Sequence, residues 1–524
     1  MGSQNPESVK VWLRPLGYLL AIASLFIIGP VVVDVALTGA HDEDLSWIQN
    51  LPEVFAGVIG IAITVVAIIV ELAANRYTAR ITDLFFKARI NSVVMSYFVI
   101  SCVQCIWVAF QTSDAIPWTP VAGTYTALGS VTVSLLLLLP YFVFVFAFLN
   151  PHNVLRRLRE HAVANINDVA SASGGLDDLK SSVIEDIEQI ADVALNAIEN
   201  KDKAISMDSV NALRSLTFDY LSIKKDLPES WFDVTGPIQS NPDFVSMTPD
   251  THVDLKARRL WLEMKILRQY QMLYGEALNR TRDINYLIAI NSRLLGEKML
   301  TEGDIEGHKL VVKFFNTYLR QTINSRDVRT AYNVLNQYRL LAENALVVGE
   351  TEQVEQIAFY FKYYGQLAFG QGLPFVLETV AYDLCALNEK AYDLDAPNKV
   401  SMLADFLEVD KESEEEHEHE STLRGVRKAQ VKLATYYLVR GATELAREVW
   451  KDMQSELPSR LVSINQELLQ IESKEYWEVI DRGANFDYLE PRRREKLEEF
   501  FSWFGESLIR ATDGQKGVAP EPPN

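Results

Sequence analysis

The placement of lysine and arginine constrains this chain more than any other feature. Neither residue occurs between Arg14 and Arg76, or between Arg89 and Arg156. A helix needs about 20 apolar residues to cross a hydrocarbon layer of about 30 Å, and runs that are apolar throughout indicate helices rather than barrel strands. We therefore predict four transmembrane helices, whose apolar runs are Leu16–Leu37, Val54–Ala74, Val93–Phe110 and Tyr125–Leu149.

The charges that flank these runs predict the orientation. The loop before the second run contains acidic residues, among them Asp42 and Asp44, and no lysine or arginine. Cationic residues mark the cytoplasmic side of membrane proteins, so both termini are expected in the cytoplasm and the protein in the inner cell membrane as a multi-pass protein. The juxtamembrane basic residues expected to meet anionic lipids are Arg76, Arg80, Lys87, Arg89, Arg156, Arg157 and Arg159.

Three polar residues in or beside the predicted spans are candidate pore or functional groups: Asp34, Glu71 and Gln104. Ionisable groups at membrane depth often mark ion pathways. Each also has a structural interpretation. Asp34 would be an interfacial acid that reaches headgroups and water. Glu71 would form an ion pair with Arg76 or with a basic residue of a neighbouring subunit, and Gln104 would form an interhelical hydrogen bond.

The segment that follows the second run resembles an uncharacterised family of bacterial predicted membrane proteins, a domain of unknown function. The family has an aromatic residue, then Ser or Thr, then any residue, then Arg, and a further aromatic residue about a turn later. Here the four consecutive positions are Tyr77-Thr78-Ala79-Arg80, and the later aromatic residue is Phe85. Glu71 stands where the family has Gln. A second patch, residues 191–198, resembles the start of the family's soluble motif, which here continues as Asn200-Lys201-Asp202-Lys203 instead of Asn-Asp-Pro. The resemblance implies an architecture and no known activity.

Apolar residues recur at helical spacing almost throughout the chain from Asn153 onward. The fold class is therefore all-α, a four-span membrane module followed by a large cytosolic helical domain. Residues 251–300 read as one long spine helix or two nearly collinear helices. The predicted parts are a cytosolic segment at 1–15, the membrane module at 16–149, a juxtamembrane helical region at 150–227, an irregular loop at 228–250, a helical domain at 251–409, an acidic linker at 410–420, a helical hairpin region at 421–511 and a disordered tail at 512–524.

One stretch matches the spacing of a tetratricopeptide repeat, in which small residues let two helices pack closely and aromatic residues fill the groove between them. The matching residues are Leu433, Ala434, Tyr437, Ala446, Trp450 and Pro458. Gln430 stands where the repeat has Trp, and one period upstream or downstream no second copy is found. We expect one such hairpin, with its groove formed by Tyr437, Ala446 and Trp450, in an otherwise irregular helical array.

The acidic tract of residues 410–420 contains His417 and His419 among carboxylates. Such residues can chelate a divalent metal weakly, but a solvated linker is the preferred interpretation. We predict no cofactor and no metal site. The formal net charge of −20 argues against nucleic acid as a partner.

No phosphate-binding glycine loop, zinc-binding HExxH motif or nucleophile elbow occurs in the sequence. We therefore predict a protein that is not an enzyme, whose cytosolic domain acts as a scaffold, sensor or adaptor at the inner membrane face. Its expected partners are membrane lipids, a cytosolic protein and other copies of the chain. The alternative is an oligomeric ion channel that the cytosolic helices gate.

Overall fold

The computed structural model describes residues 50–76, 85–86, 88–111, 121–169, 175–278, 280–410, 420–476, 481–483 and 485–505. These residues are helical or irregular, and none of them lies in a β-strand. The chain divides into two compact units, Met1–Arg157 and Leu158–Asn524.

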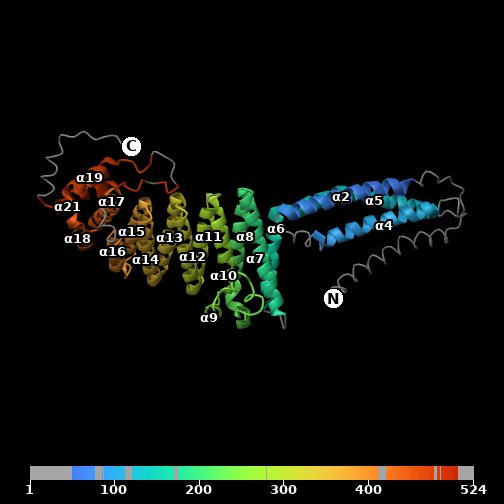
Figure 1. Ribbon diagram of the computed structural model, residues 1–524, viewed down its shortest axis with the longest axis horizontal. Coiled ribbons are helices and arrows are strands. Elements are labelled where there is room, and N and C mark those ends of the chain that lie inside the picture. The colour runs from blue at the N-terminus through green and yellow to red at the C-terminus, as the bar shows by residue number, and fades with distance from the viewer. Residues whose placement is uncertain are drawn as a thin grey trace. The chain divides into compact units, whose positions relative to one another are not determined.

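The first unit contains the helices α2 (Leu51–Arg76), α4 (Arg89–Gln111) and α5 (Val121–Leu149) (Figure 1). In the described part of the chain, three helical stretches are long and apolar enough to cross a membrane: Leu51–Ala73, Arg89–Phe110 and Thr126–Leu149. They correspond to the second, third and fourth predicted spans. The first predicted span, residues 16–37, lies outside the described residues.

Buried polar contacts join α4 to α5. Tyr141 Oη donates to Asn91 Oδ1 over 2.6 Å, and Gln104 Nε2 donates to Thr126 Oγ1 over 3.2 Å. Interhelical hydrogen bonds of this kind help hold helices together in lipid, where apolar burial gives no net driving force between them.

The helix α6 (Pro151–Asp168) leads into the second unit. The other helices that build this unit are α7 (Leu176–Glu199), α8 (Lys203–Ile223), α9 (Pro249–Ala257), α10 (Trp261–Ala277), α11 (Arg282–Thr301), α12 (Ile305–Asn324), α13 (Val328–Val348), α14 (Thr351–Gly370), α15 (Pro374–Asp393), α16 (Lys399–Leu407), α17 (Glu420–Val439), α18 (Thr443–Asp452), α19 (Pro458–Gln470), α20 (Pro491–Arg494) and α21 (Lys496–Ser502).

Consecutive helices of the second unit form hairpins that stand side by side along an array (Figure 1). One layer contains α8, α11, α13, α15 and α17, each packed on the next. The other layer contains α7, α10, α12, α14 and α16, packed in the same order. The array is therefore a stack of helical hairpins in which each hairpin contacts mainly its neighbours, as in a solenoid.

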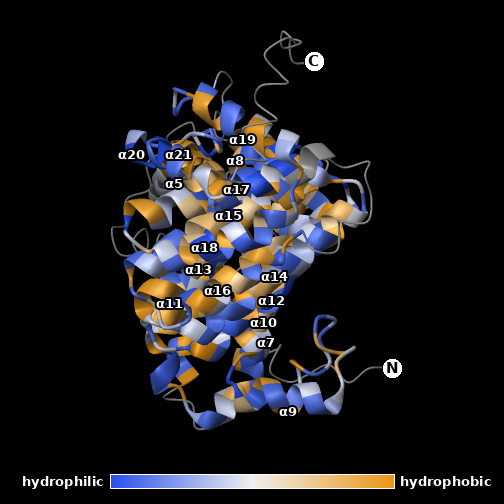
Figure 2. Cartoon of the chain, turned by 90° about the vertical axis from the view of Figure 1, so that its left-hand side faces the viewer, coloured by the Kyte–Doolittle hydropathy of each residue, from blue (hydrophilic) through white to orange (hydrophobic). Residues whose placement is uncertain are grey.

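Local sequence explains where several of these helices begin and end. Asp304 accepts a hydrogen bond from Gly307 N and Asp327 accepts one from Thr330 N, so these two aspartates are the N-caps of α12 and α13. α13 ends at Gly349, whose φ of 90° favours glycine. Hydrophilic and hydrophobic residues alternate along the helices of the array, as expected of amphipathic helices (Figure 2).

The predicted spine helix over residues 251–300 is wrong, because the chain breaks twice within it. α9 closes where Arg259 adopts a φ of 58° and Leu260 N donates back to Leu255 O. α10 ends at Ala277, and the side chain of Asn285 then donates to Tyr274 O over 2.6 Å. α10 and α11 lie in different layers and form a hairpin. The apolar residues that suggested one continuous helix therefore belong to two helices that pack against each other.

The segment between α8 and α9 is irregular but packed. It contains the short 3-10 helices Lys224–Asp226 and Glu229–Phe232 and a series of turns. The side chains of Trp231 and Phe244 are fully buried. Lys265, itself 1% exposed, binds Asp243 of this segment over 2.5 Å. The segment is thus part of the core of the array.

At the C-terminal end, the predicted helical hairpin region at 421–511 contains a non-helical stretch. α19 ends at Gln470, and the described residues 471–476, 481–483 and 485–490 are non-helical before α20 begins. Residues 411–419 of the predicted acidic linker, with His417 and His419, and residues 506–524 lie outside the described part of the chain.

Candidate functional site

A row of arginines crosses the layer that contains α8, α11, α13 and α15. Each arginine contacts an acceptor on the next helix: Arg214 Nη1 donates to Asn291 Oδ1 at 3.0 Å, Arg293 Nε donates to Gln337 Oε1 at 2.8 Å, and Arg339 Nε lies 3.2 Å from Asp383 Oδ1. We call Arg214, Arg293 and Arg339 the arginine row. It ties four consecutive hairpins together through side chains.

The row follows a repeat in the sequence. Arg293, Arg339 and Cys385 recur at equal spacing on α11, α13 and α15, and the glutamates one turn later, Glu297, Glu343 and Glu389, recur at the same spacing. Arg293 and Arg339 each form an ion pair with the glutamate of their own helix. On α15 the corresponding residue is Cys385, so the row lacks an arginine there.

The C-terminal segment supplies the missing cations. Arg482 binds both carboxylate oxygens of Asp383, at 2.5 and 3.1 Å, and its guanidinium lies 4.2 Å from the ring centre of Tyr332. Arg493, from α20, binds both carboxylate oxygens of Glu389, at 2.7 and 2.8 Å. Bidentate pairs of this kind are specific in geometry as well as strong.

The described residues 481–483 and 485–490, which we call the strap, lie against α13, α15 and α17. Phe486 stacks on Tyr382 with ring centres 4.6 Å apart. Tyr382 Oη donates to Asp487 Oδ1 over 2.5 Å, and Lys432 Nζ donates to Phe486 O over 2.9 Å. Side-chain recognition, rather than a helix or a sheet, thus holds the strap in place.

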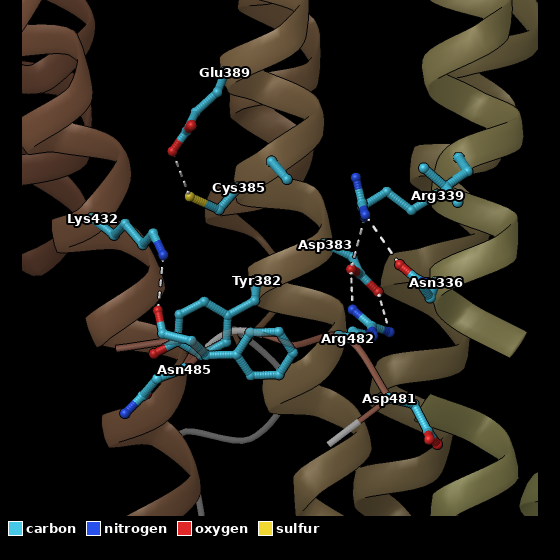
Figure 3. A pocket seen from close by; sticks show the side chains of 13 residues that line it. Asn336, Arg339, Tyr382, Asp383, Cys385, Glu389, Lys432, Asp481, Arg482 and Asn485 are labelled. Atoms are coloured by element: carbon cyan, nitrogen blue, oxygen red, sulfur yellow. Dashed lines mark hydrogen bonds and ion pairs between the residues drawn. The ribbon is translucent and has the colours of Figure 1, made fainter. Parts of the chain in front are cut away.

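Beside the strap lies a cavity of about 440 Å³ (Figure 3). Lys432 of α17 approaches it on one side of α15 and Arg339 of α13 on the other, with Cys385 between them. The lining residues are Asn336, Arg339, Leu340, Tyr382, Asp383, Cys385, Ala386, Glu389, Lys432, Asp481, Arg482, Asn485 and Phe486. The cavity therefore opens where the arginine row is interrupted.

The carboxylates around this cavity all have cationic partners. The pairs are Asp383 with Arg482, Glu343 with Arg339, Glu389 with Arg493, and Asp481 with Arg329 at 3.7 Å. Lys432 forms no ion pair with the described residues, and its ammonium group donates to a backbone carbonyl instead. One positive charge is thus left without a carboxylate at the wall of the cavity.

Burial changes the proton affinity of three groups near the strap. It raises the pKa of the Cys385 thiol well above its usual value, and nearby Glu389 adds to the shift, so this cysteine is protonated at neutral pH and a poor nucleophile. It also raises the pKa of Tyr382. The pKa of Glu378 rises to about 7, chiefly through burial and then through the like charge of Asp487.

The structure places the candidate membrane residues separately. Gln104 is buried and hydrogen-bonded to Thr126 of α5, the arrangement of an interhelical contact. Glu71 is exposed on α2. Asp34 lies outside the described residues. The described structure therefore does not bring the three candidates together.

The described juxtamembrane basic residues lie at helix ends and on α6. Arg80 and Lys87 lie outside the described residues, and Arg76 is the last residue of α2. Arg89 is exposed at the start of α4. On α6, Arg156 Nη2 donates to Asn153 over 3.4 Å, Arg157 lies 4.1 Å from the ring centre of Phe148, and Arg159 Nε lies 3.8 Å from Asp219. A partly exposed ion pair such as that of Arg159 with Asp219 contributes little to stability.

The repeat-like residues form a hairpin, with Tyr437 on α17 and Ala446 and Trp450 on α18. Tyr437 and Ala446 are fully buried, and the ring of Trp450 contacts those of Trp503 and Phe504. Tyr437 and Ala446 lie in the interior, Trp450 packs on the residues that follow α21, and none of the three lines the cavity. In the described part of the chain, no group of three or more His, Cys, Asp or Glu residues is arranged to hold a metal ion.

Sequence reasoning missed Cys385, Lys432 and Arg482, which line the cavity. A signal for part of the site was present, because Arg293-Leu294-Leu295 and Arg339-Leu340-Leu341 recur at the spacing that leads to Cys385. No comparable signal identifies Arg482, because its partner Asp383 is distant in the sequence and the two meet only when the strap folds back.

Comparisons with known proteins give one family. Residues 9–212 match the model of a family described as "Predicted membrane protein (DUF2254)". This match confirms the resemblance drawn from Tyr77, Arg80 and Phe85. It ends within α8, so the cavity lies beyond it.

No curated protein matches the chain. A solved structure described as a "Circular tandem repeat protein with novel repeat topology and enhanced subunit contact surfaces" is similar over 86% of this chain and 97% of that chain, with 13% identity and a TM-score of 0.36. A similarity at this TM-score supports no argument about fold or function.

Proposed function

We propose that this chain, a membrane protein whose residues 9–212 match a family of predicted membrane proteins, is a non-enzymatic scaffold or adaptor. Its helical array binds a segment of a protein partner at the inner membrane face. The observation that supports this role is the strap. A non-helical segment lies on the face of α13, α15 and α17, held by an ion pair, a ring stack and hydrogen bonds from its own side chains.

The contacts of the strap are those by which folded domains recognise peptides. Arg482 enters a bidentate pair with the buried carboxylate of Asp383, and Phe486 adds an aromatic anchor on Tyr382. Arginine and aromatic side chains dominate the binding energy of protein interfaces. Arrays of helical hairpins present extended surfaces to partners. The cavity beside the strap continues the same surface with polar and cationic groups.

The membrane unit would hold this array near the inner leaflet. α2, α4 and α5 provide three candidate spans. Arg89 at the start of α4 and Arg156 on α6 expose cationic groups that can meet anionic headgroups. We further propose that both termini are cytoplasmic and that the protein forms homo-oligomers. The ion-channel alternative rests on Asp34, Glu71 and Gln104, of which Gln104 is engaged with Thr126.

The proposal is tested by site-specific photocrosslinking of the full-length protein in its native membrane. A photoreactive phenylalanine analogue replaces Asn485 or Asn336 at the cavity, or Met272, an exposed residue of α10 in the other layer. We expect one discrete, identifiable protein to crosslink from the cavity positions and not from Met272. The same pattern from all three positions, or no protein crosslinked from the cavity, would contradict a partner-binding role for this face.

A further inference from the structure

The cavity exists because Cys385 replaces an arginine in the repeat. On α11 and α13 an arginine occupies the position that Cys385 occupies on α15. The shorter side chain leaves space above α15, and Arg482 and Arg493 enter from the C-terminal segment to satisfy Asp383 and Glu389. The space itself stays open, at about 440 Å³, within the range of pockets that bind small ligands or single side chains.

The charges at the wall favour an anion. The carboxylates Asp383, Glu389 and Asp481 are each bound by an arginine. Lys432, in contrast, has only the carbonyl oxygen of Phe486 as an acceptor among the described residues. An ammonium group has three donors, so two remain for a ligand.

The remaining residues of the lining are partly polar and partly apolar. The amides of Asn336 and Asn485 add polar groups to the lining, while Leu340 and Ala386 add apolar surface.

We propose that this cavity is a binding site for a carboxylate group, with Lys432 as its counter-ion. The ligand carries a single negative charge, because one cation at the wall has no carboxylate partner. Its uncharged part lies against Leu340, Ala386 and the ring of Tyr382. Two sources supply such a group, the carboxylate end of a protein chain and a small free carboxylic acid. The first source rests on the proposed function, whereas the carboxylate site itself does not.

The test measures binding to the purified full-length protein in detergent by fluorescence anisotropy. The probes are two pools of dye-labelled octapeptides with randomised last residues, one with free C-terminal carboxylates and one amidated. N-acetyl-leucine represents the small acid, and its amide is the uncharged control. Both are added as competitors of the bound peptide pool, and their direct binding is measured by calorimetry. We expect the free-acid pool to bind about tenfold more tightly than the amidated pool, the effect of one charge-assisted hydrogen bond.

Lys432→Met removes the charge and keeps the length of the side chain, and we expect it to abolish the preference for the free acid. Lys432→Arg restores a cation and should restore the preference. Lys390→Met is the matched control, because Lys390 is on α15 and outside the cavity lining. Circular dichroism and the melting temperature of each variant show whether it is folded, so that a loss of binding is not mistaken for a loss of structure.

Each outcome decides the proposal. Equal binding of both pools, a preference that survives Lys432→Met, or no binding of any probe would overturn it. Binding of N-acetyl-leucine alone, dependent on Lys432, would sustain the carboxylate site and count against the protein partner. A partner crosslinked from the cavity whose binding ignores Lys432 would sustain the proposed function and overturn the carboxylate site.

Discussion

Asp383→Asn tests the reasoning about the strap most directly. The side chain of Asp383 is 2% exposed, and it binds Arg482 and Arg339 at once. Asparagine keeps the shape and removes the charge, so Arg482, 8% exposed, loses its only carboxylate among the described residues. Removing one partner of a buried ion pair typically costs about 3–5 kcal/mol.

We expect a value near the lower end, about 3 kcal/mol, for a structural reason. Arg339 retains Glu343, and the strap retains the stack of Phe486 on Tyr382. A loss of about 3 kcal/mol corresponds to a local opening equilibrium shifted by about 100-fold. The change should be concentrated in the strap, because Arg482 is the residue that loses its counter-ion.

Hydrogen–deuterium exchange measured by mass spectrometry reports this opening. The amides of Asn485, Asp487 and Tyr488 donate to acceptors within the protein, so they exchange only when the strap opens. We expect their exchange to accelerate about 100-fold, with little change in α10. Glu343→Gln is the control, since it removes a partly exposed pair and should cost about 1 kcal/mol or less. Exchange of the strap that changes less than in this control would refute the reasoning.

Three further predictions concern the rest of the molecule. The pKa of Glu378 is raised from 4.5 to about 7 in the folded protein, so the folded state binds this proton more tightly than the unfolded state does. The free energy of unfolding, measured in urea, should therefore fall by up to about 3 kcal/mol as the pH rises from 4.5 through 7. An equal fall in Glu378→Gln would contradict this. A Cβ on Gly425 would lie 2.5 Å from Cδ of Glu378. Gly425→Ala should therefore lower the free energy of unfolding by about 1–2 kcal/mol in the wild type and by much less when Glu378 is also alanine. Equal losses in the two backgrounds would argue against this contact. Tyr141→Phe removes the hydrogen bond to Asn91 and should lower the stability of the membrane unit by about 1 kcal/mol in a detergent titration, whereas an unchanged midpoint would show that this bond contributes nothing.

The membrane unit was the part most open to sequence reasoning. Its helices follow from uninterrupted apolar runs, and Gln104 takes the interhelical hydrogen bond that its position suggested. In the array, Asp304 and Asp327 accept N-cap hydrogen bonds from residues three positions later, a local interaction that depends only on neighbouring residues. The spine helix was wrong because a continuous apolar stripe does not distinguish one long helix from two helices that fold back at Leu278.

The sequence by itself determined the all-helical class, three of the four predicted spans as helices in the described structure, and the membrane setting, because each depends on residue type and local periodicity. Only the tertiary structure decided where the hairpins stack and where the cavity opens. In the sequence, Cys385 is marked only by its spacing from Arg293 and Arg339, and Arg482 stands in a segment without helical periodicity. They line one cavity because hairpin stacking places Cys385 next in line after Arg293 and Arg339, and the strap folds back over α15. Such contacts between residues distant in sequence depend on packing geometry, which local patterns do not record.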